Sequence, residues 1–213
     1  MMIDPHVMLN EAVQRLGDQN VFMPNAMMNA CGVACRVEWN NRHPLPFAEE
    51  SFIPPFEGAK GTLVFGVPSS PKQLYDMNPD RFVAFGQYTP VDVLMDQACS
   101  LMVPQPGWRL LWSPAYNEEL VTGEGNSEHV IQKLAARGYC PASAAVALQA
   151  GIAMFGRKQR LGGGQYAALG DFAFVRGLFK RTFMLADEER LVFATSEKCE
   201  PGPLLESIPI YLP

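Results

Sequence analysis

The chain has 213 residues, enough for one domain with a substantial hydrophobic core, and its 48% hydrophobic and 18% charged residues exclude an intrinsically disordered protein. Its net charge of −5 argues against a domain that is basic all over, as most nucleic-acid binders are. Five cysteines at scattered positions argue against a closed disulfide framework, and the first residues lack a basic start followed by an apolar run, so we expect synthesis in the cytoplasm without a signal peptide.

The N-terminal half predicts two helices and two strands around a loop. Asp4 and Pro5 are typical of a helix start, and apolar residues at helical spacing continue to Leu16. Short runs rich in β-branched and aromatic residues, bounded by turn formers, predict the strands. The predicted ranges are helices over 5–16 and 24–36, a proline-rich loop over 40–55, and strands over 61–67 and 81–85.

The C-terminal half alternates helices and strands without the regular spacing of βαβ units. A sustained apolar stripe follows Pro90, and the run WRLLW lies between two proline-containing turns. The predicted ranges are a helix over 90–102, strands over 108–112 and 190–195, a hairpin arm over 116–125, a helix over 127–137, and an alanine-rich helix between Pro141 and Arg157. We therefore predict a single α+β domain over residues 1–199, with a small mixed or antiparallel sheet packed by several helices. Residues 200–213, punctuated by proline, predict an extended C-terminal tail.

An uncharged stretch of 19 residues, Gly138–Gly156, is long enough to span a membrane. Its apolar content is mostly alanine, which contributes little to insertion, and it contains Gln149, Ser143 and Pro141. We expect a buried helix here and no membrane span.

The charges are distributed unevenly along the chain. Residues 157–181 contain six cations and one carboxylate, a net charge of +5, which leaves −10 for the rest of the chain. Such a basic segment on an acidic body indicates docking to an anionic partner. We expect its aromatic residues, Phe172, Phe174 and Phe179, to belong to the core. The exposed part would then be a basic loop beside three glycines, and its predicted binding residues are Arg157, Lys158 and Arg160.

Cys31 is the one residue that resembles a placed nucleophile. In the run NACGVAC it lies near a possible helix start, where the helix dipole would lower the pKa of a thiol. A thiol-dependent hydrolase would also need a histidine close in the fold, and the candidates are His43 and His129. The competing interpretation is that Cys31 and Cys35 are small core residues on one helix face.

Metal and cofactor motifs are incomplete. Cys31, Cys35 and His43 have a zinc-like spacing but lack the second close pair that a structural zinc site needs. The run from Gly162 to Ala167 formally matches a dinucleotide-binding fingerprint, but no hydrophobic strand precedes it. We predict no metal site and no cofactor.

These observations favour a non-enzymatic structural or adaptor subunit of a larger protein assembly, of the virion, tail or secretion-complex type. The basic loop and the C-terminal tail would contact other protein subunits, and self-association is the expected partnership. Two alternatives stay open: a cysteine-dependent hydrolase or transferase using Cys31, and a nucleic-acid-associated module using the basic segment 157–181.

Overall fold

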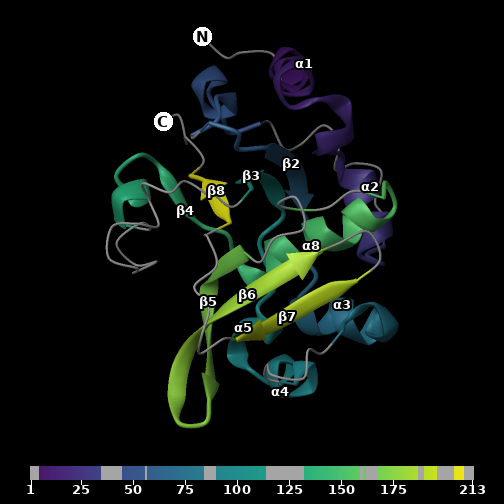
Figure 1. The fold of residues 1–213 in the computed structure, drawn as a ribbon. Helices are drawn as coiled ribbons and strands as arrows, with labels where there is room; N and C mark the ends of the chain where they lie inside the picture. The colour runs from purple at the N-terminus through teal and green to yellow at the C-terminus, as the bar shows by residue number, and fades with distance from the viewer. Residues whose placement is uncertain are drawn as a thin grey trace.

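The computed structural model describes residues 5–34, 45–55, 57–83, 90–113, 132–158, 161, 167–186, 190–195 and 204–208, with side chains described from Met8 onward. These residues form helices and two sheets in one compact α+β domain, which confirms the predicted fold class (Figure 1). The predicted arm over 116–125 lies outside the described residues, as does most of the helix predicted over 127–137, of which residues 132–135 are helical.

The first sheet is mixed and has the strand order β1-β2-β3-β8-β4. Strand β1 runs parallel to β2, and every other neighbouring pair is antiparallel. Strands β2 and β3 match the runs predicted over 61–67 and 108–112 and are largely buried. The strand bounds are β1 Val21–Phe22, β2 Gly61–Gly66, β3 Gly107–Trp112, β4 Tyr139–Pro141 and β8 Leu205–Ser207.

The second sheet is antiparallel, with the order β5-β6-β7. Its strands are β5 Ala167–Val175, β6 Leu178–Ala186 and β7 Leu191–Thr195, the last of which was predicted. Strands β5 and β6 form a hairpin whose two-residue turn, Arg176 and Gly177, has positive φ at both positions, 52° and 81°. Figure 1 shows this hairpin extending beyond the rest of the sheet at the lower left.

Helix α8, Ala144–Phe155, packs against both sheets and forms the centre of the core. All its residues are buried, as expected for the uncharged alanine-rich stretch, and the Ser143 side chain caps its first turn. A Cβ on Gly151 would lie 3.2 Å from Ala186 Cβ and 3.2 Å from Met184 Cε, so glycine permits the close approach of β6. Figure 1 shows α8 crossing behind β6 and β7.

The other helices cover the edges and outer faces of the sheets. Helix α1 confirms the prediction over 5–16, and α3 begins with a capping box between Ser70 and Gln73 that was not recognised in the sequence. The helix bounds are α1 Pro5–Leu16, α2 Pro24–Ala30, α3 Pro71–Met77, α4 Val91–Met95 and α5 Ala98–Leu101. Single 3-10 turns are η1 Asp18–Asn20, η3 Glu49–Phe52 and η4 Pro79–Arg81.

The single helix predicted over 90–102 is wrong, because the chain forms two short helices, α4 and α5. Gln97 has extended backbone angles, and the Ser100 hydroxyl donates a hydrogen bond of 2.6 Å to the Leu94 carbonyl. A serine side chain that satisfies a nearby carbonyl competes with the helical hydrogen bond. The apolar stripe is therefore distributed over a helix pair.

The strand predicted over 81–85 is also wrong for its described part. Arg81 ends the turn η4, and Phe82 forms only an isolated parallel bridge to Leu191. Helix α2 ends at Ala30, six residues before the predicted end at Arg36. Gly32 follows with a φ of 61°, a left-handed conformation that is incompatible with continuing the helix.

Part of the predicted C-terminal tail belongs to the fold. Strand β8 lies between β3 and β4, and Leu204 and Leu205 are fully buried. The Trp112 Nε1 group donates a hydrogen bond of 3.1 Å to Ser207 Oγ, which joins β8 to the neighbouring strand. Leu205–Ser207 form a strand, and residues 204–207 lie against this chain's own core.

Candidate functional site

Cys31 lies at the end of helix α2, where the sequence had suggested a helix start. It caps the C-terminal end of the helix, and its side chain is 1% exposed. Burial raises the pKa of the thiol from 9.0 to about 12. Both its burial and its position at the negative end of the helix dipole disfavour the thiolate that a nucleophile requires.

An open pocket of about 380 Å³ adjoins Cys31. Its lining includes Ser69, Gln73 and Asp76, and no histidine is among the described residues that line it. His43 and His129, the predicted partners of Cys31, lie outside the described residues. Among the described residues, the titratable side chain that shares this pocket with the thiol is therefore the Asp76 carboxylate and not a histidine.

Arg157 makes contacts within its own chain. Its guanidinium donates hydrogen bonds to the carbonyls of Asp18, Gln19 and Val21, at 3.1, 2.7 and 3.1 Å. The guanidinium carbon also lies 4.1 Å from the centroid of the Phe22 ring. Arg157 thus joins the end of α8 to η1 and β1, although part of its side chain stays exposed.

The other two predicted binding residues differ from Arg157. Lys158 is exposed and has a φ of 53°, in the left-handed region that non-glycine residues rarely adopt. Arg160 lies outside the described residues. The role of these cations in binding stays a prediction.

The expectation that Phe172, Phe174 and Phe179 belong to the core is wrong. Their side chains are 46%, 52% and 77% exposed, whereas Ala173 and Val175 between them are buried. Alternate residues of a strand point to opposite faces, so one face of the hairpin packs inward and the other presents the rings to solvent. The alternating spacing of these phenylalanines in the sequence is compatible with a face that points to the core or with one that points to solvent.

The exposed aromatic side chains are arranged in cross-strand pairs. The rings of Phe174 and Phe179, which are partners in the β5–β6 register, lie with centroids 5.1 Å apart. The guanidinium carbon of Arg181 lies 4.5 Å from the centroid of its cross-strand partner Phe172. Such pairs stabilise a hairpin face even without burial.

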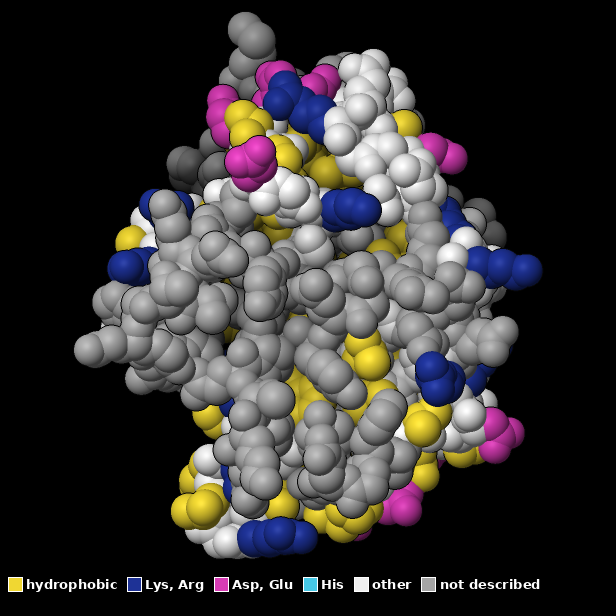
Figure 2. Space-filling model, viewed as in Figure 1, with side chains coloured by type: hydrophobic (Ala, Val, Ile, Leu, Met, Phe, Trp, Pro, Cys, Tyr) yellow, Lys and Arg dark blue, Asp and Glu magenta, His cyan; other side chains and the backbone are white. Residues whose placement is uncertain are grey.

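We define the hairpin surface as the exposed side chains of Phe172, Phe174, Arg176, Leu178 and Phe179. Leu178, the cross-strand partner of Val175, is exposed beside the turn on the face opposite the rings. Lys180 and Arg181 follow it on β6 and are half-buried. In Figure 2, hydrophobic side chains lie beside Lys and Arg side chains at the lower left, where Figure 1 places the hairpin. Large exposed apolar groups gathered in this way mark interaction sites on proteins.

The hairpin is fixed to the domain along its outer strand. The backbone N–H of Phe174 donates a hydrogen bond of 3.0 Å to Oε1 of Gln97, the residue that precedes α5. Further along β5, Gly170 donates to the Ala142 carbonyl at 2.8 Å. The Asp171 carboxylate accepts a hydrogen bond from the backbone of Ala144 at the start of α8. These contacts cover the edge strand and hold the aromatic rings on a stable support.

A second exposed apolar group borders the hairpin. Val93 on α4 and the consecutive residues Leu101, Met102 and Val103 at the end of α5 are all exposed, and we call these four residues the helical strip. The contact between Gln97 and Phe174 shows that the α4–α5 pair lies directly beside β5. Two carboxylates on this helix pair, Asp92 and Asp96, are also exposed. Asp92 accepts a hydrogen bond from the Tyr75 hydroxyl of α3. The pKa of Lys72 on α3 is raised by its bond to Asp76, and Asp92 and Asp96 lie close enough to add to that rise.

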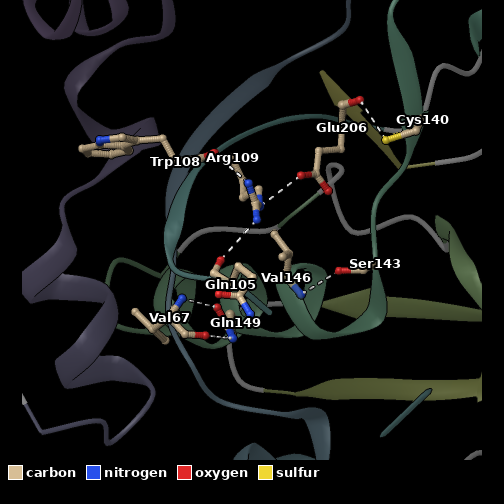
Figure 3. Close-up of polar contacts among 9 residues, drawn as sticks. All are labelled: Val67, Gln105, Trp108, Arg109, Cys140, Ser143, Val146, Gln149 and Glu206. Carbon is tan, nitrogen blue, oxygen red and sulfur yellow. Dashed lines mark hydrogen bonds and ion pairs between the residues drawn. The ribbon is translucent and has the colours of Figure 1, made fainter. Parts of the chain in front are cut away.

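The interior contains two polar clusters, which Figure 3 shows together. Gln149 of α8 is fully buried, accepts a hydrogen bond from Val67 N at 3.0 Å, and donates to the carbonyls of Val67 and Ser69 at 2.8 and 2.7 Å. Arg109 Nε lies 3.3 Å from Glu206 Oε1, across β3 and β8. Burial raises the pKa of Glu206, and Arg109 opposes that shift. Each cluster joins elements of the core, so we assign both a structural role.

Neither family models, nor curated proteins, nor solved structures provide a match to this chain. Within the described residues, no three His, Cys, Asp or Glu side chains are grouped in a way that could hold a metal ion. The helices that the structure describes are all too short or too polar to cross a bilayer. The hairpin surface is the candidate functional site, because its large apolar side chains are exposed and do not contribute to the core.

Proposed function

We propose that this chain is a non-enzymatic structural or adaptor subunit of a larger protein assembly, of the virion, tail or secretion-complex type, and that the hairpin surface contacts a neighbouring protein. One observation carries the proposal: three phenylalanines and a leucine, 46% to 77% exposed, gather on one projecting hairpin. Full burial of each such side chain would contribute about 1.5–3 kcal/mol. A protein neighbour that covers them would gain much of that contribution.

The attachment of the hairpin supports the same proposal. The contacts of Phe174, Gly170 and Asp171 with the body already order the hairpin in the free chain. A surface that is ordered before binding loses less conformational entropy when a partner arrives. The hairpin is therefore suited to a stable contact within an assembly.

The structure changes which residues we propose as contacts. Arg157 already bonds to three carbonyls of its own chain, and Leu204–Ser207 belong to the buried sheet. In our proposal the main contact moves from the basic loop and the tail to the hairpin surface. Lys158 and Arg160 remain secondary contacts in this proposal.

Photo-crosslinking tests the proposed function. A photoreactive phenylalanine analogue would replace Phe179, in a full-length chain produced at its natural level in the cells that make it. The matched control places the analogue at Ile53, another exposed apolar residue, which follows η3. We expect discrete protein adducts from position 179 and none from position 53. The absence of discrete adducts from position 179 would contradict the proposed function.

A nucleic-acid-associated module is the second candidate, because exposed aromatic rings beside cations can stack on bases. The stacking of Arg181 on Phe172 is the observation that favours it. This function predicts binding to single-stranded DNA that strengthens as salt is lowered. Absence of binding at low salt would eliminate it.

A further inference from the structure

We propose that the neighbour of the hairpin surface is a second copy of this chain, bound across a two-fold axis so that the hairpin of each copy lies against α4 and α5 of the other. This inference rests on the proposed function, because it identifies the partner of the same surface. Two-fold dimers are the commonest assemblies of identical chains. They require one patch that is complementary to itself.

The apolar part of the patch meets this requirement. The hairpin surface and the helical strip lie beside each other, joined where Gln97 accepts the hydrogen bond from Phe174 N. Rotation about an axis between them would place the rings of Phe174 and Phe179 over Leu101 and Met102 of the other copy. Aromatic and methionine side chains pack well on each other and are enriched in interfaces.

The charges of the patch are also self-complementary. Arg176 lies at the exposed turn, and Lys180, the cross-strand partner of Ala173, lies on β6 on the face opposite the rings. Asp92 and Asp96 lie on the helix pair. The proposed rotation would bring the cations of each copy toward the carboxylates of the other, which orients the two chains.

The same carboxylates disfavour the other occupants of the surface. Asp92 and Asp96 would repel the phosphates of nucleic acid or of an anionic bilayer that approached the helical strip, and Lys72 of α3 offsets part of that repulsion. The chain as a whole has a net charge of −5, which adds to that repulsion at low salt. A second copy supplies both the apolar surface and the opposite charges.

The backbone at the turn gives a further reason to assign a contact to Arg176. Its φ of 52° lies in the left-handed region, which two-residue hairpin turns usually fill with Asn, Asp or Gly. Arginine is strained there, and a strained residue at an exposed turn is a reason to look for a function. In the proposed dimer, the guanidinium of Arg176 provides the interaction that Asn or Gly would lack.

Charge reversal tests the dimer. Sedimentation velocity across the micromolar range would compare the full-length wild-type chain with two double variants, Arg176→Glu/Lys180→Glu and Asp92→Lys/Asp96→Lys. We expect a wild-type dimer and, for each variant alone, a dissociation constant raised at least about tenfold by facing like charges. An equimolar mixture of the two variants restores opposite charges at both contacts, so we expect a mixed dimer with near wild-type affinity.

The controls separate folding from association. Circular dichroism and thermal melting should show that both double variants fold. Arg137→Glu and Glu50→Lys reverse exposed charges away from the patch and should leave the dimer intact. A wild-type chain that stays monomeric, or variants that dimerise as tightly as the wild type, would overturn the inference. A mixture that fails to restore the dimer would overturn the two-fold arrangement.

Other occupants of the surface are separate outcomes. Binding of a monomeric wild-type chain to phosphatidylserine vesicles or to a single-stranded DNA oligonucleotide, abolished by Arg176→Glu/Lys180→Glu, would overturn the inference in favour of lipid or nucleic acid. Crosslinks from position 179 to a different protein, together with a monomeric purified chain, would overturn the inference and leave the proposed function intact. Absence of any protein adduct would overturn both.

Discussion

The ring of Phe174 lies tilted by 54° against the ring of Phe179, with 5.1 Å between centroids, on the solvent side of the β5–β6 hairpin. Both side chains are more than half exposed, so the pair forms without the support of a core. Cross-strand aromatic pairs contribute about 0.2–1 kcal/mol to a sheet, much less than burial of both rings would. The pair therefore stabilises the hairpin modestly and leaves most of its apolar surface available to a partner.

Replacing Arg176 with Asn should change the stability of the chain and the affinity of the dimer in opposite directions. Asn tolerates the positive φ at this turn, so we expect Arg176→Asn to raise the free energy of unfolding by about 0.5 kcal/mol. The same change removes a cation from the proposed contact and should weaken the dimer several-fold. Urea unfolding and sedimentation measure the two effects. A variant that is more stable and dimerises as tightly as the wild type would show that Arg176 has no part in the contact.

Arg157→Ala should destabilise the fold. The change removes three hydrogen bonds to carbonyls and the stacking on Phe22, and we expect a loss of about 1–2 kcal/mol, reduced by the partial exposure of the side chain. Lys158→Ala is the matched control and should change the free energy of unfolding by less than about 0.5 kcal/mol. Urea denaturation measures both. Equal stability of the two variants would contradict a structural role for Arg157.

Cys31 should react slowly with alkylating reagents in the folded chain. A pKa raised from 9.0 to about 12 lowers the thiolate fraction near neutral pH by about 1,000-fold, and burial restricts access further. Iodoacetamide labelling followed by peptide mass spectrometry would compare the native chain with the urea-unfolded chain. Faster labelling of Cys31 in the native chain than in the unfolded chain would contradict this expectation and favour a thiol-dependent hydrolase.

Glu206→Gln should alter how stability depends on pH. Burial raises the pKa of Glu206 in the folded chain, so the carboxyl ionises more easily in the unfolded chain. Below the unfolded pKa the carboxyl is protonated in both states, and its full contribution to the free energy of unfolding is present. That contribution is lost as pH rises through the folded pKa. We therefore expect the wild type to lose stability relative to Glu206→Gln as pH rises from about 4 to 7.

Urea unfolding at several pH values tests this expectation. Glu50→Gln is the control, because the Glu50 side chain is exposed on η3. A wild type that gains stability relative to Glu206→Gln over the same interval would show that the ion pair with Arg109 outweighs the burial of the carboxylate.

The sequence predicted those elements whose pattern has one physical solution. These elements are the helix that ends at Leu16, the alanine-rich helix α8, and strands β2, β3 and β7, whose runs are apolar and bounded by turn formers. Their predicted ranges are close to the observed ones because the pattern of each is set by its own residues. The helix over 90–102 failed because the Ser100 side chain competes for a helical carbonyl. Such a contact depends on geometry that periodicity does not encode.

The hairpin surface could not be placed from sequence for a different reason. Alternation in the run from Phe172 to Val175 shows that two faces differ, but it does not show which face meets the core. The small side chain of Ala173 lies on the face that packs against the core, and the larger rings of Phe172 and Phe174 lie on the face exposed to solvent. The role of Arg157 was equally hidden, because its carbonyl partners lie about 140 residues away in the sequence. The signal that was available and missed was Gly177, a turn former between two runs of alternating apolar residues.

The most direct test of the central claim is the mass of the chain in solution, measured by light scattering at increasing concentration. The wild type is compared with Phe174→Ser/Phe179→Ser and with Ile53→Ser, an exposed apolar control away from the hairpin. We expect the wild type and Ile53→Ser to approach twice the mass of one chain, and the double variant to stay at the mass of a single chain. A wild type that remains monomeric, or a double variant that reaches the same mass as the wild type, would contradict the claim that the hairpin surface binds a second copy.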